Sequence, residues 1–362
     1  MDKAVEETLK ELNNEKLIVE KEKDTDNGMT ESELKFIDLC CGIGGFHIGL
    51  KGYQCVLACD INKHCRESYE RNYGLKCEED IFDIDIQNLK PFDILCAGFP
   101  CQPFSSAGLK NGMKDDRSKV YNQILNIVKH KTPSIVLLEN VKNLLVMNKG
   151  EVIKKIVNDL KELNYSVSYS ILTTARFGLA QNRERVYFVC VNKTKYPNST
   201  FDFSKLESTN IKKTLRETIS CGNKEYLPVD KYVLLDQERI KTQKSGLMFC
   251  GYLKGNLRKN GALPDTEHLS RVHKQPNRIY HIDGVNPTLS SSEGSGRYYI
   301  YDGTGVRNLN VDECFKIMGF PDYYKQHDKK HVNYCQIGNA VSPVIVESIK
   351  NELINQGFVP DG

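Results

Sequence analysis

Short apolar runs alternate with longer stretches of helical spacing along the first half of the chain. The apolar runs are "FIDLCC", "CVLACD", "FDILCAG", "SIVLLEN" and "RVYFVCV", and each is typical of a buried strand. Between them lie "KHCRESYERNY", "SKVYNQILNIVKHK" and "EVIKKIVNDLKELN", which have the apolar spacing of helices. Strands that alternate with helices of this length predict an α/β fold with a parallel sheet covered on both faces. The alternation begins near residue 36 and continues to about residue 191.

The pattern changes after this point. Residues from about 194 to 300 show no regular β/α alternation and are rich in Lys, Asn, Gly and Ser, which predicts a second, smaller and irregular domain. The carboxyl-terminal stretch "SPVIVESIKNELINQ" returns to the pattern of an amphipathic helix with one face to bury. Residues 1–33 have the pattern of a charged helix followed by a polar stretch, and we expect a flexible extension without a catalytic role.

Composition narrows the class of protein. The chain has 362 residues, of which 40% are hydrophobic and 27% charged, the balance of a soluble globular protein. No apolar run approaches the roughly 20 residues of a membrane helix, and the acidic amino terminus lacks the apolar core of a signal peptide. We expect a cytoplasmic protein without membrane contact. Its 13 cysteines lack the paired spacing of a zinc site, so we expect reduced thiols and no metal.

Charge is unevenly distributed. The net charge is +3, but residues 1–35 hold eleven acids and six bases, which leaves about +8 on the rest of the chain. From residue 239 to residue 278, nine Lys and Arg accompany only two acids. A solvated loop can have this composition by chance, but it also suits a surface that faces phosphates. The basic stretch therefore favours a nucleic-acid partner.

Several polar groups follow predicted strands, where ligands of open α/β sheets bind. The glycine turn "CCGIGGF" follows the first strand, and it could bind a cofactor or simply close a strand–helix corner. Asp60 ends the second strand, where a carboxylate can accept hydrogen bonds from ribose hydroxyls. Asp80 stands where a third strand would end and could hold an adenine amino group. A single acid is commonly a helix cap, but acids at successive strand ends favour an adenosine-containing cofactor.

A second group of residues has the chemistry of catalysis. In "FPCQPFS" two prolines fix the backbone around Cys101, a frame that a core cysteine does not need. Glu139 closes the apolar run of the neighbouring strand, where desolvation raises a carboxyl pKa and makes a proton donor, although it could instead pair with a helix terminus. Arg183 and Arg185 share one face of the next strand and can grip a base edge or a phosphate together.

With these residues assembled, the sequence resembles the cytosine-C5 DNA methyltransferases of bacterial restriction–modification systems, from residue 36 to about residue 349. "FIDLCCGIGGF" is similar to the family's cofactor motif, "FPCQPFS" to its nucleophile motif, "ENVKNL" to its acid motif and "QNRERVYFV" to its arginine motif. "VDECFKIMGFPDYY" and "QIGNAVSPVI" resemble the two closing motifs. Six motifs in the family's order leave little room for coincidence.

The resemblance implies a Rossmann-like, S-adenosylmethionine-dependent methyltransferase. It implies transfer of a methyl group from S-adenosylmethionine to C5 of a flipped cytosine in a specific double-stranded DNA sequence, through a covalent adduct between Cys101 and C6. Glu139 would hydrogen-bond N3 and the exocyclic amine, and Arg185 the O2 edge. Arg183 would hold the loop and nearby phosphates.

The resemblance also implies the cofactor contacts, which are Phe46, Gly42, Gly44, Asp60, Ile61, Asp80 and Asn339. At the position of Asp60 the family usually has a glutamate followed by a large apolar residue. The pair Asp60-Ile61 departs from that pattern, and we expect looser packing against adenine.

For DNA, the resemblance implies an interrupted organisation. Residues 34–193 and 334–359 would form the catalytic domain, and residues 194–333 the target-recognition domain and hinge. The expected DNA contacts are Gln102, Ser105, Lys110, Arg258, Arg271, Lys274 and Arg278. The loop 104–119 would close over the flipped base, and Ala107 stands where some relatives carry a serine that fills the vacated space. We expect the enzyme to act as a monomer.

Three alternatives are weighed against this interpretation. The tRNA-methylating branch of the superfamily typically has a "CFT" signature, which this sequence lacks, since "FCGY" at residue 249 is a different tetrapeptide. An inactive DNA-binding relative would have lost a catalytic position, but Cys101, Glu139, Arg183 and Arg185 are all present. A nicotinamide-dependent dehydrogenase needs a third glycine at the turn and gives Cys101 no role.

Overall fold

A computed structural model describes residues 34–100, 116–206, 208, 213–219, 225–255 and 266–360, of which 116–118 are described by their backbone alone. The predicted extension 1–33 lies outside these residues, as does most of the loop 104–119. Cys101, Gln102, Ser105, Ala107, Lys110 and Arg258 also lie outside them.

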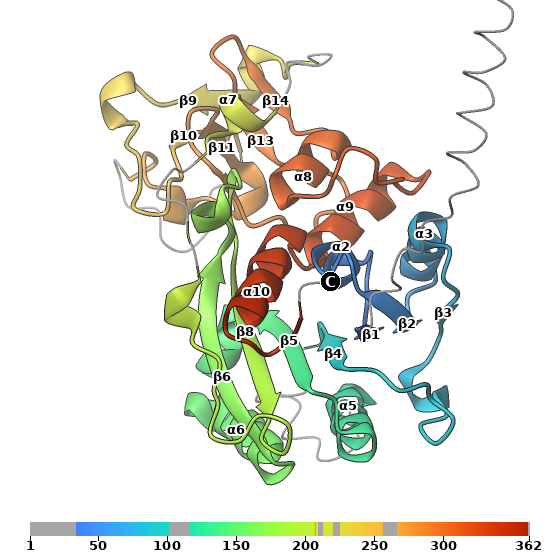
Figure 1. Cartoon of the computed structure of the whole chain (residues 1–362). Coiled ribbons are helices and arrows are strands. Elements are labelled where there is room, and N and C mark those ends of the chain that lie inside the picture. The colour runs from blue at the N-terminus through green and yellow to red at the C-terminus, as the bar shows by residue number, and fades with distance from the viewer. Residues whose placement is uncertain are drawn as a thin grey trace, which may run out of the picture.

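A seven-stranded sheet forms the centre of the lower part of the molecule in Figure 1, with the order β3-β2-β1-β4-β5-β8-β6. The strands are β1 (Lys35–Leu39), β2 (Gln54–Cys59), β3 (Cys77–Glu78), β4 (Ile94–Ala97), β5 (Ile135–Val141), β6 (Tyr165–Thr173) and β8 (Glu184–Asn192). The first five strands pair in parallel, with β1 between β2 and β4. Their carboxyl ends therefore meet at one edge.

The sheet is mixed, which corrects the expectation of an all-parallel sheet. Strand β8 is antiparallel to both of its neighbours, β5 and β6. Only the short link 174–183 joins β6 to β8, and a connection of that length cannot make the crossover that parallel strands require.

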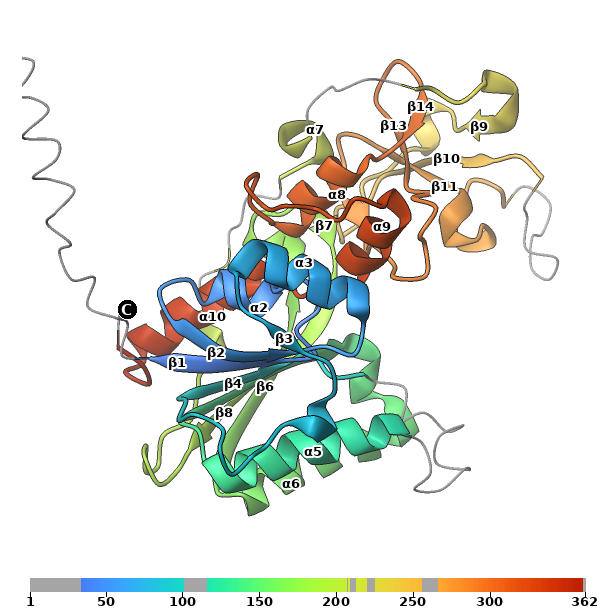
Figure 2. The same ribbon diagram turned by 90° about the vertical axis from the view of Figure 1, so that its right-hand side faces the viewer.

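Helices cover both faces of the sheet, as the alternating pattern predicts. Figure 2 shows α5 (Asp116–Lys131) and α6 (Glu151–Glu162) on one face, and α2 (Gly45–Gly49), α3 (Lys63–Tyr73) and α10 (Pro343–Asn355) on the other. One buried cluster joins Ile124 of α5 and Ile156 of α6 to Val136 of the sheet. A second joins Phe46 and Ile345 to the opposite face.

The last helix of the chain returns to the first strand–helix unit. Helices α2 and α10 pack so closely that a Cβ atom added at Gly49 would overlap the Cβ atom of Val346. The hydroxyl of Tyr53, just after α2, donates to the carbonyl of Pro360 at 2.9 Å. The amphipathic pattern of the carboxyl-terminal stretch thus has its buried face here.

A smaller sheet forms the second region, with the order β14-β13-β11-β10-β9. Its strands are β9 (Tyr232–Leu234), β10 (Phe249–Leu253), β11 (Arg278–His281), β13 (Tyr299–Tyr301) and β14 (Val306–Asn308). Strand β12 (Asn286–Pro287) pairs with β7 (Gln181–Asn182), which joins this region to the link before β8. Helices α7 (Leu215–Thr218), α8 (Val311–Met318) and α9 (Lys330–Asn339) complete the described helices.

The described cysteines are free thiols, and eight of the eleven are buried. Burial raises the pKa of most of these thiols, so they remain protonated and serve as small apolar side chains. Within the described ranges, no helix is both long enough and apolar enough to span a membrane.

Candidate active site

The glycine turn between β1 and α2 is fixed to the end of β2. Gly42 and Gly44 have φ angles of 56° and 81°, the left-handed region that glycine occupies without steric cost. The amide of Gly42 donates to Oδ2 of Asp60 at 2.8 Å, and the amide of Gly44 donates to the carbonyl of Cys41 at 2.9 Å. A Cβ atom at Gly42 would meet no atom of the described residues within 4 Å, so the turn is open toward them at this point.

Asp60 is shared between this turn and the start of α3. Its Oδ1 accepts from the amide of Asn62 at 2.8 Å, so each oxygen has one backbone donor and retains capacity for another. Burial raises the pKa of Asp60, while the amides of Asn62 and Gly42 oppose this effect. The next side chain, Ile61, is 76% exposed, which is unusual for a large apolar residue.

Asp80 holds the same position beside β3. Its side chain accepts from the amide of Phe82 at 3.0 Å, and the ring of Phe82 is 45% exposed. At the ends of two neighbouring strands, a carboxylate is therefore followed by an exposed apolar side chain. The carboxylates suit ribose hydroxyls or an amino group as donors, and the apolar side chains suit the face of a base. Sequence reasoning missed Phe82. The available signal was an aromatic residue just behind the strand-end acid in "EEDIF".

The structure does not place Phe46 at this surface, contrary to expectation. Phe46 is only 1% exposed and packs with Leu50 and Ile345, because its position on α2 faces the sheet and α10. Asn339, in contrast, is exposed at the last residue of α9. The chain then passes close to the glycine turn, since a Cβ atom at Gly45 would overlap the carbonyl oxygen of Val341.

Glu139 lies buried near the end of β5 and forms an ion pair with Arg185 of β8. Their Oε1 and Nε atoms are 3.1 Å apart, and no described residue gives Oε1 a hydrogen bond, so charge holds the pair. Burial raises the pKa of Glu139, and the two cations Arg185 and Arg183 oppose that rise. The carboxyl group is therefore more easily protonated near neutral pH than an exposed glutamate.

The segment that leads to Cys101 passes directly beside Glu139. A Cβ atom added at Gly98 would lie 3.9 Å from Oε2 of Glu139 and 3.9 Å from the carbonyl oxygen of Cys40. The side-chain amide of Asn140 donates to the carbonyl of Phe99 at 2.9 Å. This buried contact holds the chain just before Cys101, and sequence reasoning did not single out Asn140.

Arg183 is a buried anchor of the surrounding loops. It is 1% exposed, and its guanidinium donates to the carbonyls of Leu289 at 3.3 Å, Gly338 at 3.0 Å and Ala340 at 2.8 Å. These contacts suit the expected loop-holding role. They leave no guanidinium surface for a DNA phosphate, which corrects that part of the expectation, because the side chain precedes β8 and faces the α9–α10 corner.

Residues 34–355 match the protein family described as C-5 cytosine-specific DNA methylase. The chain belongs to this family. It is 34% identical over 320 residues to the type II methyltransferase M.HhaI of Haemophilus parahaemolyticus, covering 85% of this chain and 90% of that protein. It is 32% identical over 329 residues to the type II methyltransferase M.NgoBI of Neisseria gonorrhoeae, covering 87% and 92%.

Solved structures share the fold of this C-5 cytosine-specific DNA methylase. The Dnmt2 methyltransferase of S. pombe superposes with a TM-score of 0.62 at 19% identity, covering 89% of this chain and 99% of that chain. The family and its relatives establish the chain as a DNA cytosine-C5 methyltransferase of the bacterial type II kind, and they exclude the dehydrogenase alternative.

Of the expected DNA contacts, the structure of this methylase describes Arg271, Lys274 and Arg278, all in the second region. Arg271 and Lys274 are exposed. Arg278 is half-buried, and its Nε and Nη2 donate to the carbonyl of His273 at 3.1 Å and 2.9 Å. With Gln275 it lines a cavity of about 170 Å³. The guanidinium of Arg278 is therefore held in place before any ligand is present.

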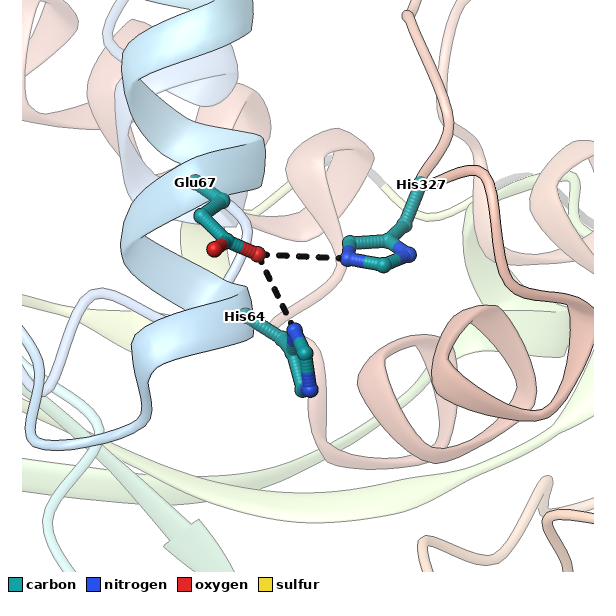
Figure 3. Close-up of side chains that lie close together, drawn as sticks. All are labelled: His64, Glu67 and His327. Carbon is teal, nitrogen blue, oxygen red and sulfur yellow. Dashed lines mark hydrogen bonds and ion pairs between the residues drawn. The ribbon is translucent and has the colours of Figure 1, made fainter.

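Two histidines and a glutamate meet between α3 and the segment before α9 (Figure 3). Nδ1 of His64 and Nε2 of His327 lie 3.0 Å and 3.3 Å from the same oxygen of Glu67. These residue types bind zinc elsewhere. Here, however, the amide of Lys329 donates to Nδ1 of His327 at 3.0 Å, so the ring proton lies on Nε2 and points to Glu67. A histidine that binds a metal through Nε2 instead carries its proton on Nδ1 and donates it to a neighbouring acceptor. The geometry therefore favours a bridge in which both histidines hydrogen-bond to Glu67.

Proposed function

We propose that this enzyme methylates C5 of a cytosine that has been flipped out of double-stranded DNA, using S-adenosylmethionine and a covalent bond to Cys101. The observation that carries the proposal is the buried pair of Glu139 and Arg185 beside the segment that leads through Gly98 to Cys101. A proton donor, a cation and a thiol would then face one base.

The strand-end residues fit the cofactor. An adenosine needs an apolar surface for its base and acceptors for its ribose hydroxyls and amino group, and the ends of β2 and β3 present both. We propose that Asp60 accepts from the ribose, Asp80 from the adenine amine, and that exposed Ile61 and Phe82 flank the ring. When bound, S-adenosylmethionine supplies an electrophilic methyl group.

The chain's own residues would activate the base. C5 of cytosine is a weak nucleophile, so the Cys101 thiolate bonds to C6 while protonated Glu139 donates its proton to N3. Arg185 lies within ion-pair distance of Glu139 and would bind O2 of the same ring. After C5 gains the methyl group, a water molecule takes the C5 proton, the electron pair of that C–H bond forms the C5=C6 double bond, and the bond between C6 and sulfur breaks to release the Cys101 thiolate. N3 returns its proton to Glu139, and the aromatic ring and the thiolate are both restored.

The base must leave the duplex, because neither C5 nor C6 can be reached inside the stack. We propose that residues 194–333 hold the duplex, with exposed Arg271 and Lys274 on phosphates and Arg278 on a base edge. Residues 34–193 and 334–359 would form the catalytic domain.

Methylation of unmethylated plasmid DNA followed by bisulfite sequencing tests this function. We expect one cytosine of a short recurring sequence to resist conversion, and only when S-adenosylmethionine is supplied. Transfer RNA incubated in parallel should convert completely. Protection of tRNA but not of plasmid DNA would contradict the proposal.

A further inference from the structure

The carbonyl of Ile43 lies in the centre of the glycine turn and receives two tyrosine hydroxyls. Tyr73, at the end of α3, donates from 3.1 Å, and Tyr324, after α8, donates from 3.1 Å. A carbonyl oxygen has two lone pairs and can accept both. The hydroxyl of Tyr73 also lies 3.2 Å from the carbonyl of Gly44, which offers it an alternative acceptor.

These contacts fix one peptide plane at both ends. The peptide between Ile43 and Gly44 has its N–H bonded to the carbonyl of Cys41 at 2.9 Å and its C=O bonded to the tyrosines. Glycine at position 44 could otherwise let this plane rotate at little cost. The ring of Tyr73 also covers Gly44, where an added Cβ atom would overlap it. The orientation of the turn therefore depends on side chains outside it.

The segment that carries Tyr324 is anchored independently of its hydroxyl. Asn72 and Lys325 exchange two hydrogen bonds, of 2.9 Å and 2.7 Å. Arg71 donates to the carbonyl of Gln326 at 2.8 Å and pairs with Asp328 at 3.0 Å. Because these contacts hold the segment on α3, removing the Tyr324 hydroxyl takes away one contact to the turn and leaves the docking in place.

We propose that Tyr324 is a positioning residue for the cofactor: together with Tyr73 it holds the Ile43 carbonyl, and so presets the turn that binds S-adenosylmethionine. The inference rests on the proposed function for the identity of the ligand. It makes cofactor affinity depend on a side chain that does not touch the cofactor and that comes from the closing part of the chain. By linkage, bound cofactor stabilises the docking of that part on α3.

The sequence offers a matched control, because the adjacent Tyr323 is 72% exposed while Tyr324 is buried. Calorimetry with S-adenosylmethionine should be run on the full chain and on Tyr324→Phe, Tyr323→Phe and the double variant Tyr73→Phe/Tyr324→Phe. We expect Tyr324→Phe to weaken binding about three- to tenfold, the worth of one hydrogen bond, and the double variant to weaken it further. Tyr323→Phe should bind within about twofold of the native chain.

Kinetics separate positioning from catalysis. In Tyr324→Phe the KM for S-adenosylmethionine should rise in step with Kd, while kcat at saturating cofactor stays within about twofold, because the hydroxyl contacts no reacting atom. If the native chain does not bind S-adenosylmethionine, the proposed cofactor is wrong. If it binds and Tyr324→Phe binds equally well, or loses kcat at unchanged Kd, the positioning role is wrong. Should Tyr324→Phe unfold, Tyr73→Phe removes the other donor to the same carbonyl, and the same two criteria apply.

Discussion

Glu139 owes its proposed chemistry to its surroundings at the end of β5. Replacement by Gln removes the transferable proton, keeps the volume and leaves Arg185 without its charge partner. We expect Glu139→Gln to lower the single-turnover rate by about 10²–10⁴-fold, with the Kd of S-adenosylmethionine within about twofold. Glu162→Gln, on the exposed end of α6, is the control and should retain the native rate. A Glu139→Gln rate within about tenfold of native would remove Glu139 from the mechanism.

Protonation of Glu139 should also make the reaction rate depend on pH. Burial raises the pKa of Glu139, so the protonated donor persists to higher pH than in an exposed glutamate. Activity that needs this proton is present below the folded pKa and lost as pH rises through it. We therefore expect a descending limb on the alkaline side of the rate profile, measured at saturating cofactor and DNA. The limb should be missing in the residual rate of Glu139→Gln.

Cys101 can be tested by a change of one atom. A neutral serine hydroxyl is a far weaker nucleophile than a thiolate, so Cys101→Ser should abolish methyl transfer and largely preserve DNA binding in a mobility-shift assay. Cys335→Ser, a partly exposed thiol of α9, should remain fully active. Turnover of Cys101→Ser within about tenfold of the native enzyme would rule out covalent attack by this residue.

The role of an individual residue was predictable where a reactive side chain stands at a position whose burial the sequence pattern also indicates. An acid that closes an apolar run, as Glu139 does, indicates desolvation from the sequence alone, and the structure buries it. Phe46 shows the limit, because a motif gives a residue's neighbours in sequence but not the face of α2 on which it lies. Phe82 was not predicted as a site residue, because an aromatic residue in a short apolar run normally packs into the core. Its exposure depends on the tertiary fold, which the sequence pattern does not give.

At the scale of elements, strongly periodic segments were predicted well. The stretch "KHCRESYERNY" coincides with α3, where Asn62 caps the first turn and Gly74 ends the helix in the left-handed region. Strand β6 was not predicted, although its stretch "YSVSYSILT" alternates polar and apolar residues. The antiparallel direction of β8 was not predicted either, and it follows from the short link 174–183. Local pattern fixes an element's type, whereas its direction in the sheet depends on partners distant in sequence.

The docking of α3 should depend on pH through Glu67. Hydrogen bonds from His64 and His327 lower the pKa of this carboxyl group. A lowered folded pKa gives stabilisation that is present above the unfolded glutamate pKa of about 4.3 and is lost as pH falls through the folded value. Thermal unfolding should therefore show Glu67→Gln melting roughly 1–2 °C lower at pH 7, with the difference shrinking below about pH 4.3 and vanishing once the pH is below the lowered folded pKa. A difference that is independent of pH would exclude the bridge as its cause.

For the whole molecule, the decisive feature is that the carboxyl-terminal helices pack against the first strand–helix unit, beside the proposed cofactor site. The α9–α10 corner lies against Gly45, while Arg183 binds the carbonyls on both sides of Asn339. We therefore expect Asn339 to reach the turn only when the carboxyl-terminal helices are docked on α2. A sequence motif predicts that Asn339 belongs to the proposed site, but the close packing of α10 at Gly49, on which that placement would depend, is a property of the tertiary fold.

This arrangement predicts that Asn339 contributes to cofactor affinity although about 290 residues separate it from the glycine turn. Asn339→Ala should weaken S-adenosylmethionine binding by roughly 1–1.5 kcal/mol, the cost of one hydrogen bond and about a tenfold rise in Kd. Asn355→Ala, at the other end of α10, is the control for a surface change on the same helical pair and should bind normally. Calorimetry on both variants separates the two outcomes. Equal affinity would mean that the end of α9 only closes the domain, and that the cofactor is held by the amino-terminal strand ends alone.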